Sequence, residues 1–185
     1  MNYHNLTYPD MNNGDGLRVV LWLSGCSHNC YKCQNPQTHD PNSGILFDEM
    51  AKKELFRELN KDYISGLTLT GGDPLHEHNL DTVLNLVNKI RLLMPEKTIW
   101  LYTGYLINVT EQYNCDHSII ETTPRNNNEL DWKREEIIRK CNVVVDGRYI
   151  DSLRNISKKW AGSDNQRCIN IPQSLQQGKV VLYCD

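Results

Sequence analysis

Short apolar runs alternate with amphipathic segments along the chain. Residues 17–24 (LRVVLWLS) form a run rich in β-branched side chains, which is typical of a buried strand. The runs GLTLT at 66–70, TIWLYT at 98–103 and NVVVDG at 142–147 predict three further strands. Towards the C-terminus, the segments CINI and KVVLY are candidates for strands at a sheet edge.

Two segments repeat their apolar residues at helical spacing. From Phe47 to Leu59, apolar side chains recur four residues apart, so they share one face of a predicted helix. Residues 79–94 keep a helical periodicity, and Pro95 marks the end of that helix. A weaker pattern predicts a third helix near residues 130–140.

This alternation of strands and helices predicts an α/β fold with βαβ units and a mostly parallel, curved sheet. Four short polar segments, SGC, TGGDP, TG and DG, each follow a predicted strand directly. In parallel α/β folds this edge of the sheet binds ligands, so we expect these loops to converge on one site. With 185 residues, the chain fits one domain and is shorter than the roughly 250 residues of a closed eight-stranded barrel. An incomplete barrel or an open sheet is therefore expected.

Charge and hydropathy exclude some classes of partner. The formal net charge is −3 and the isoelectric point is about 6.1, so no broad basic surface for nucleic acid is expected. No apolar run approaches the roughly 20 residues that span a membrane. The polar N-terminal segment lacks the apolar core of a signal peptide. We therefore expect a cytoplasmic protein with neither a nucleic acid nor a membrane as its partner.

Three of the seven cysteines, Cys26, Cys30 and Cys33, lie within the loop SGCSHNCYKCQNP. In a reducing compartment such a cluster is more often metal-binding or catalytic than disulfide-bonded. A C-x3-C-x2-C loop can hold three corners of a [4Fe–4S] cluster and leave one iron for a substrate, as catalytic metal sites keep one position open. The alternative is a structural zinc site closed by His28, by His39 or by a distant cysteine.

The remaining four cysteines are scattered and are interpreted as small apolar or surface thiols. They are Cys115, Cys141, Cys168 and Cys184.

The segment TGGDP gives the predicted ligand edge a second feature. Its glycines let a backbone approach a ligand closely, and the Asp73 carboxylate could pair with a ligand ammonium. Alone, GGDP favours a plain turn over a ligand site. Beside the cysteine loop, it favours a ligand with amino and carboxylate groups that reaches the open iron.

Several other residues have structural interpretations. Trp100 and Tyr102 share one face of a strand, which favours core packing over substrate contact. His76 and His78 are expected at the surface, and the charges at 133–136 on a solvated helix face. The polar segment WAGSDNQR at 160–167 is expected to cover the ligand site or to contact a partner. Within that segment, Asn165 and Arg167 are the preferred candidates.

The chain resembles the radical S-adenosylmethionine (radical SAM) superfamily, whose hallmark is C-x3-C-x2-C. The more specific resemblance is to the anaerobic ribonucleoside-triphosphate reductase-activating proteins. It rests on MNYHNLTYPD, DGLRVVLWLSGCSHNCYKCQNP, GLTLTGGDPL, IWLYTGY, VVVDGRY and WAGSDNQR, in family order. It implies a single radical SAM domain over 1–185, with an incomplete (βα) barrel. Residues 112–139, which include the polar break PRNNN at 124–128, are interpreted as an insertion, and the tail after 167 is unassigned.

The resemblance also implies a ligand set. The three clustered cysteines would ligate a [4Fe–4S] cluster, and the methionine part of SAM would chelate the fourth iron. The implied SAM contacts are Gly71, Gly72 and Asp73 for the methionine ammonium, and Lys32, Cys33 and Gln34 for the adenosine. Two positions depart from the superfamily pattern: Asp73 stands where many relatives have Glu, and Lys32 where many have an aromatic residue.

The activity implied by the resemblance is reductive cleavage of SAM to methionine and a 5′-deoxyadenosyl radical. That radical would generate a glycyl radical on the large subunit of an anaerobic (class III) ribonucleoside-triphosphate reductase. A low-potential donor such as flavodoxin would supply the electron, and no catalytic side chain beyond the cluster and SAM ligands is expected. Two alternatives are an activase of another glycyl-radical enzyme and a non-catalytic zinc-binding module.

Overall fold

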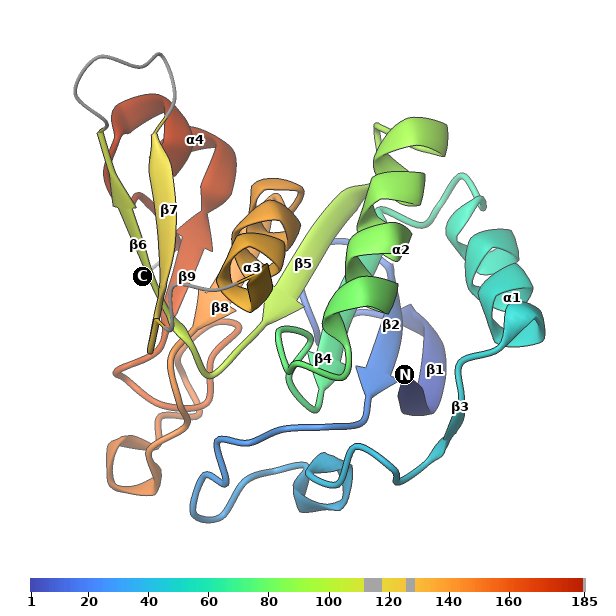
Figure 1. The fold of residues 1–185 in the computed structure, drawn as a ribbon, viewed down its shortest axis with the longest axis horizontal. Coiled ribbons are helices and arrows are strands. Elements are labelled where there is room, and N and C mark those ends of the chain that lie inside the picture. Colours follow the sequence, from blue (N-terminus) through green and yellow to red (C-terminus); the bar gives the residue numbers. More distant parts are fainter. Residues whose placement is uncertain (112–117, 126–128, 185) are drawn as a thin grey trace.

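An eight-stranded sheet forms the centre of the computed structural model (Figure 1), which describes residues 1–111, 118–125 and 129–184. In spatial order its strands are β10 (Leu182–Cys184), β9 (Arg167–Asn170), β8 (Val143–Asp146), β5 (Thr98–Tyr102), β4 (Gly66–Gly71), β2 (Arg18–Leu23), β1 (Asn2–Asp10) and β3 (Ile45–Leu46). The strands predicted at 17–24, 66–70, 98–103 and 142–147 are present as β2, β4, β5 and β8, and the two C-terminal candidates form β9 and β10.

The sheet is mixed. Its four central strands, β2, β4, β5 and β8, pair in parallel, whereas β1, β3, β9 and β10 add antiparallel pairs on both sides. The α/β class is therefore confirmed, but a mostly parallel sheet holds for the centre alone. Within the described residues, β3 and β10 end the sheet at opposite edges and it stays open.

Three helices cover one face of the sheet (Figure 1): α1 (Glu49–Leu59), α2 (Leu80–Leu93) and α3 (Glu129–Arg139). Each matches a predicted helix. Asp48 is the N-cap of α1: its carboxylate accepts the N–H groups of Met50 and Ala51, which stabilises the start of the helix. A short helix, α4 (Ile171–Gln177), follows β9, and 3-10 turns lie at Pro36–Thr38 and Asp151–Leu153.

Two parts of the fold were not predicted. Strand β1 has a single buried position, Tyr3, since it lies next to the sheet edge. The hairpin of β6 (Leu106–Thr110) and β7 (Ile119–Thr123) forms a separate two-stranded sheet, although its burial alternates as a half-buried strand should. Strand β7 and helix α3 lie within the expected insertion at 112–139, whereas β6 precedes it. Residues 112–117 and 126–128, which include Cys115 and part of PRNNN, lie outside the described residues.

Successive side chains of the central strands point to opposite faces. Val19, Leu21 and Leu69 join the core beneath the helices, whereas Trp100 and Val145 belong to a second cluster on the opposite face. That second face carries no long helix in the described part of the chain. A membrane-spanning helix was not found in any of the described residues, since none of their helices has the required length and apolar character.

Candidate functional site

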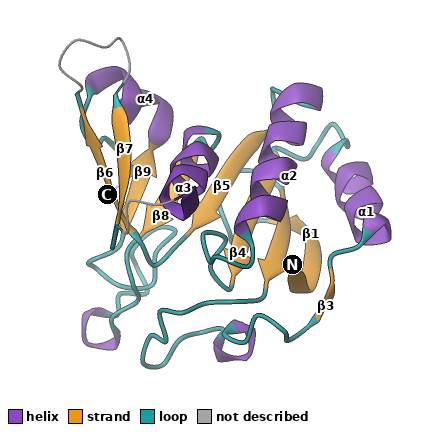
Figure 2. Cartoon of the chain, in the orientation of Figure 1, coloured by secondary structure: helices purple, strands orange, loops and turns teal. Residues whose placement is uncertain are grey.

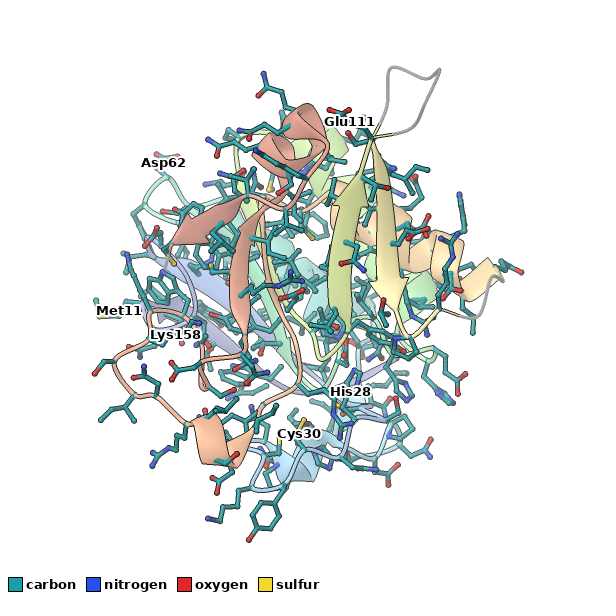
Figure 3. All side chains as sticks on the ribbon, turned by 90° about the vertical axis from the view of Figure 1, so that its left-hand side faces the viewer. Met11, His28, Cys30, Asp62, Glu111 and Lys158 are labelled. Atoms are coloured by element: carbon teal, nitrogen blue, oxygen red, sulfur yellow. The ribbon has the colours of Figure 1, made fainter. Side chains whose placement is uncertain are left out.

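The loops after the four parallel strands gather at one end of the sheet (Figure 2). They line a common cavity of about 130 Å³, to which all three clustered cysteines and the GGD turn contribute. His28 and Cys30 lie close together at this end of the molecule, and Asp62 and Glu111 lie towards the opposite end (Figure 3). The convergence expected from the strand ends is therefore present.

The cysteine loop has a tight, irregular backbone. Gly25, Asn29 and Lys32 have φ values of 94°, 47° and 53°, in the left-handed region that favours glycine and tolerates asparagine. At its start the loop is held by the N–H of Gly25, bonded to the Thr38 carbonyl at 2.8 Å, and by the N–H of Cys26, bonded to the His39 carbonyl at 3.0 Å. The loop is thus anchored before the first thiol.

The three thiols, on Cys26, Cys30 and Cys33, are each half-buried at the cavity. Burial, with the Asp73 carboxylate as the next cause, raises the pKa of Cys26 to about 12. A metal must displace this proton to bind the thiolate. The Asn35 N–H lies 3.3 Å from the Cys33 sulfur, a contact of the kind that tunes iron–sulfur clusters.

The three thiols border one cavity without forming a compact single-ion site. Among the described residues, no group of three or more His, Cys, Asp or Glu side chains is placed to hold one metal ion. A [4Fe–4S] cluster would bind one thiolate at each of three corners. His28, a candidate zinc ligand in the sequence, contacts Asp73 with its Nε2.

The glycines of the GGD turn allow two backbones to meet. Gly71 has a φ of 95°, and a Cβ on Gly72 would lie 2.6 Å from the Gly25 carbonyl oxygen. The N–H of Asp73 donates to that same carbonyl at 2.8 Å. The turn is therefore packed directly against the residue that precedes the first cysteine.

The Asp73 carboxylate is buried and is bonded within the protein. It lies 2.7 Å from His28 Nε2 and accepts the Thr103 hydroxyl at 2.9 and 3.0 Å. The N–H groups of Leu75 and Gly104 donate to it at 2.8 and 3.0 Å. The sequence offered no signal for this network beyond the TG that follows β5 and a histidine between two of the cysteines.

A larger cavity of about 420 Å³ adjoins the first one on the face of the sheet opposite α1, α2 and α3, the face that carries Trp22, Thr70 and Tyr102, and volumes of this order hold small-molecule ligands. Cys33, Tyr102 and Gln166 line both cavities. Aromatic and amide side chains dominate the rest of the larger lining, among them Trp22, Asn13, Gln34 and Trp160. Trp160 has a φ of 61°, and its buried indole N–H has no hydrogen-bond partner among the described residues.

Only two of the three residues implied as adenosine contacts line the larger cavity. Cys33 and Gln34 line the larger cavity, whereas the Lys32 side chain is exposed and pairs with Asp151 at 2.9 Å. Trp100 is 2 % exposed and belongs to the core, as predicted. Tyr102 reaches both cavities.

The segment 160–167 contributes Trp160, Gly162 and Gln166 to the larger cavity. Its preferred candidates have other roles: Asn165 donates to the Arg148 carbonyl at 2.8 Å, and Arg167 forms a two-point ion pair with Asp146. These contacts fix the loop to the end of β8.

The other residues predicted at the surface differ in how exposed they are. His78 is exposed, and His76 is half-buried with its ring 5.2 Å from that of His78. The solvated-face prediction for 133–136 is wrong for Arg134, which is 3 % exposed and pairs with Asp131. The Arg134 side chain also donates to the Leu75 carbonyl and lies over the Tyr105 ring, and these contacts bury it despite its charge.

The scattered cysteines are structural where they are described. Cys141 and Cys168 are buried, as a small apolar residue would be. Cys168 also faces Cys184 across the antiparallel pair β9–β10.

Comparison with known proteins supports the iron–sulfur interpretation. The family model described as a 4Fe-4S single cluster domain matches residues 12–169. The chain is 40 % identical over 167 residues to the anaerobic ribonucleoside-triphosphate reductase-activating protein of Enterobacteria phage T4, which covers 90 % of this chain and 92 % of the relative.

Two bacterial relatives bear the same name. The protein of Escherichia coli K12 is 36 % identical and that of Haemophilus influenzae 33 % identical, each over 168 residues, 90 % of this chain and 96 % of the relative. The chain therefore belongs to the family of anaerobic ribonucleoside-triphosphate reductase-activating proteins and carries a 4Fe-4S single cluster domain.

Proposed function

We propose that this protein activates an anaerobic ribonucleoside-triphosphate reductase by reductive cleavage of SAM at a [4Fe–4S] cluster. In this proposal it is a radical SAM oxidoreductase, and the product is a glycyl radical on the large reductase subunit. The observation that carries the proposal is the joining of two cavities. One is lined by three thiols and the GGD turn, the other has the volume and the aromatic lining for a nucleoside, and Cys33 belongs to both.

The chain's own residues would bind and orient the cofactors. Cys26, Cys30 and Cys33 would hold the cluster, which, once reduced by the low-potential donor, would supply the electron that cleaves the sulfonium of SAM. Gly71 and Gly72 let the turn pack against the backbone of the cysteine loop, because a side chain at either position would meet the backbone of Leu23 or Gly25; this packing would place the turn beside the cluster and the methionine part of SAM. Cys33 and Gln34 border the larger cavity, where we place the adenosine.

The reductase would approach the sheet face that carries the larger cavity, opposite α1, α2 and α3. The larger cavity opens on this face, and its polar rim includes Asn12, Asn13 and Lys158. An extended glycine-containing segment of the partner could approach SAM from this side without displacing a helix. This arrangement suits the open sheet, and the incomplete barrel of the radical SAM type remains part of the proposal.

We further propose a low-potential donor such as flavodoxin and a cytoplasmic setting, in which the three thiols stay reduced. One domain over residues 1–185 would carry the activity.

Radical transfer is the decisive experiment. The anaerobically reconstituted protein is mixed with reduced flavodoxin, SAM and the large reductase subunit. We expect 5′-deoxyadenosine and methionine to form, with a glycyl-radical EPR signal on the reductase. SAM cleavage without that signal would favour another glycyl-radical enzyme as the target. Stoichiometric zinc and no SAM cleavage would favour the non-catalytic zinc module.

A further inference from the structure

We infer that Asp73 is a positioning residue: acting through His28, its carboxylate fixes the cysteine loop and does not receive the ligand's ammonium. This inference deepens the proposed function and rests on it. It departs from the interpretation of GGDP as an ammonium-binding motif, in which the Asp73 side chain contacts SAM directly.

The Asp73 carboxylate is already fully hydrogen-bonded within the protein. An ionised carboxylate has about four lone-pair sites, and four protein donors already surround it: His28, the N–H groups of Leu75 and Gly104, and the single O–H of Thr103, which lies within reach of both oxygens. The residue is 3 % exposed. An ammonium group would have to displace one of these donors and leave it buried without a partner, which is costly.

His28 connects the Asp73 carboxylate to the cysteine loop. It occupies the middle of the segment between Cys26 and Cys30, and its ring is almost buried, with 10 % of the side chain exposed. Because a carboxylate only accepts, Nε2 must donate to Asp73. Edge-on packing against Tyr105 at 4.9 Å holds the ring. The side chain thus tethers the loop at the point between two thiols.

A third observation extends the tether. The Arg148 guanidinium donates to the backbone carbonyl of His28, so this residue is held from both its side chain and its backbone. Thr103 and Gly104 attach the same carboxylate to the end of β5. The Asp73 network therefore joins the loops after β2, β4 and β5, and it sets where the thiols of Cys26 and Cys30 can lie.

A double-mutant cycle separates positioning from ligand contact. The variants are Asp73→Asn, His28→Ala and the pair together, with His28→Gln as the conservative variant that keeps a donor at similar reach. His78→Ala is the matched control, since that histidine is exposed and lies outside the network. SAM affinity and the EPR spectrum of the reduced cluster are measured for each variant.

If Asp73 acts through His28, the two single variants weaken SAM binding by a similar factor, and the pair is no worse than either one, as coupled residues require. His28→Gln restores most of the loss, and the EPR line shape of the cluster changes in both single variants. If Asp73 instead binds the ammonium, Asp73→Asn alone costs roughly tenfold or more in affinity, as losing a charge-assisted bond should. The effects of the two variants would then add, and the inference would be overturned.

A measurement on the cluster-free chain keeps this inference distinct from the proposed function. Amide hydrogen exchange across residues 25–33 should accelerate in Asp73→Asn and in His28→Ala, and should stay slow in His28→Gln and His78→Ala. Unchanged exchange in the first two variants contradicts the tether. A wild-type protein that binds neither cluster nor SAM refutes the proposed function instead and leaves the exchange result to decide the tether.

Discussion

The two faces of the central sheet differ in what their side chains do. On the helix-covered face, positions such as Leu21, Leu67 and Leu69 are wholly buried among apolar neighbours. On the other face, Trp22, Thr70 and Tyr102 line the larger cavity. The same strands therefore supply stability with one set of alternating residues and a binding surface with the other.

This division makes the two faces separable by mutation. Changes beneath the helices should lower the free energy of unfolding and leave the site chemistry intact. Changes at the loop end should remove function from a folded protein.

The largest effect is expected at the three thiols. Cys26→Ala, Cys30→Ala or Cys33→Ala should each abolish SAM cleavage, because each removes a cluster ligand, while circular dichroism should show an unchanged fold. Cys141→Ala is the control, since this cysteine is buried beneath the helices and should keep its cluster. Full activity in any of the three ligand variants would show that the assignment is wrong.

Leu69→Ala should have the largest effect on stability. This side chain is fully buried, and its loss should lower the free energy of unfolding by about 2–5 kcal/mol. Chemical denaturation measures the change. At temperatures where the variant is folded, its cluster content should equal that of the wild type; a lost cluster in a folded variant would show that the faces are not independent.

Gly104→Ala should disturb the site with little effect on stability. A Cβ at this position would overlap the His28 imidazole, whereas the backbone conformation of Gly104 itself is open to alanine. We expect weaker SAM binding, in the direction of His28→Ala, with a small change in the denaturation midpoint. SAM affinity equal to that of the wild type would show that the ring of His28 can move freely.

The smallest effect is expected for Lys32→Ala. The Lys32 side chain is 59 % exposed and pairs with Asp151 away from both cavities, and exposed ion pairs contribute little. SAM affinity, measured by titration, should therefore stay close to that of the wild type. A large loss would restore Lys32 to the adenosine contacts implied by the family resemblance.

The sequence was informative where one physical signal dominated. Strands β2, β5 and β8 contain apolar runs and β4 alternates leucine with threonine, because all four lie at the centre of the sheet, and the loops that follow them were predictable from Gly and Cys. Strand β1 lacks such a run because it lies beside the edge. The partner of Asp73 was not predictable, since His28 and Thr103 are 45 and 30 residues from it along the chain and meet it through the sheet topology alone.

The central claim is that the three thiols hold a cluster with one iron open to SAM. EPR spectra of the anaerobically reconstituted and reduced protein, recorded with and without SAM, test it most directly. We expect a [4Fe–4S]⁺ signal whose line shape changes when SAM is added. A cluster signal that SAM leaves unchanged would contradict the claim, and so would a protein that contains one zinc per chain and gives no EPR signal.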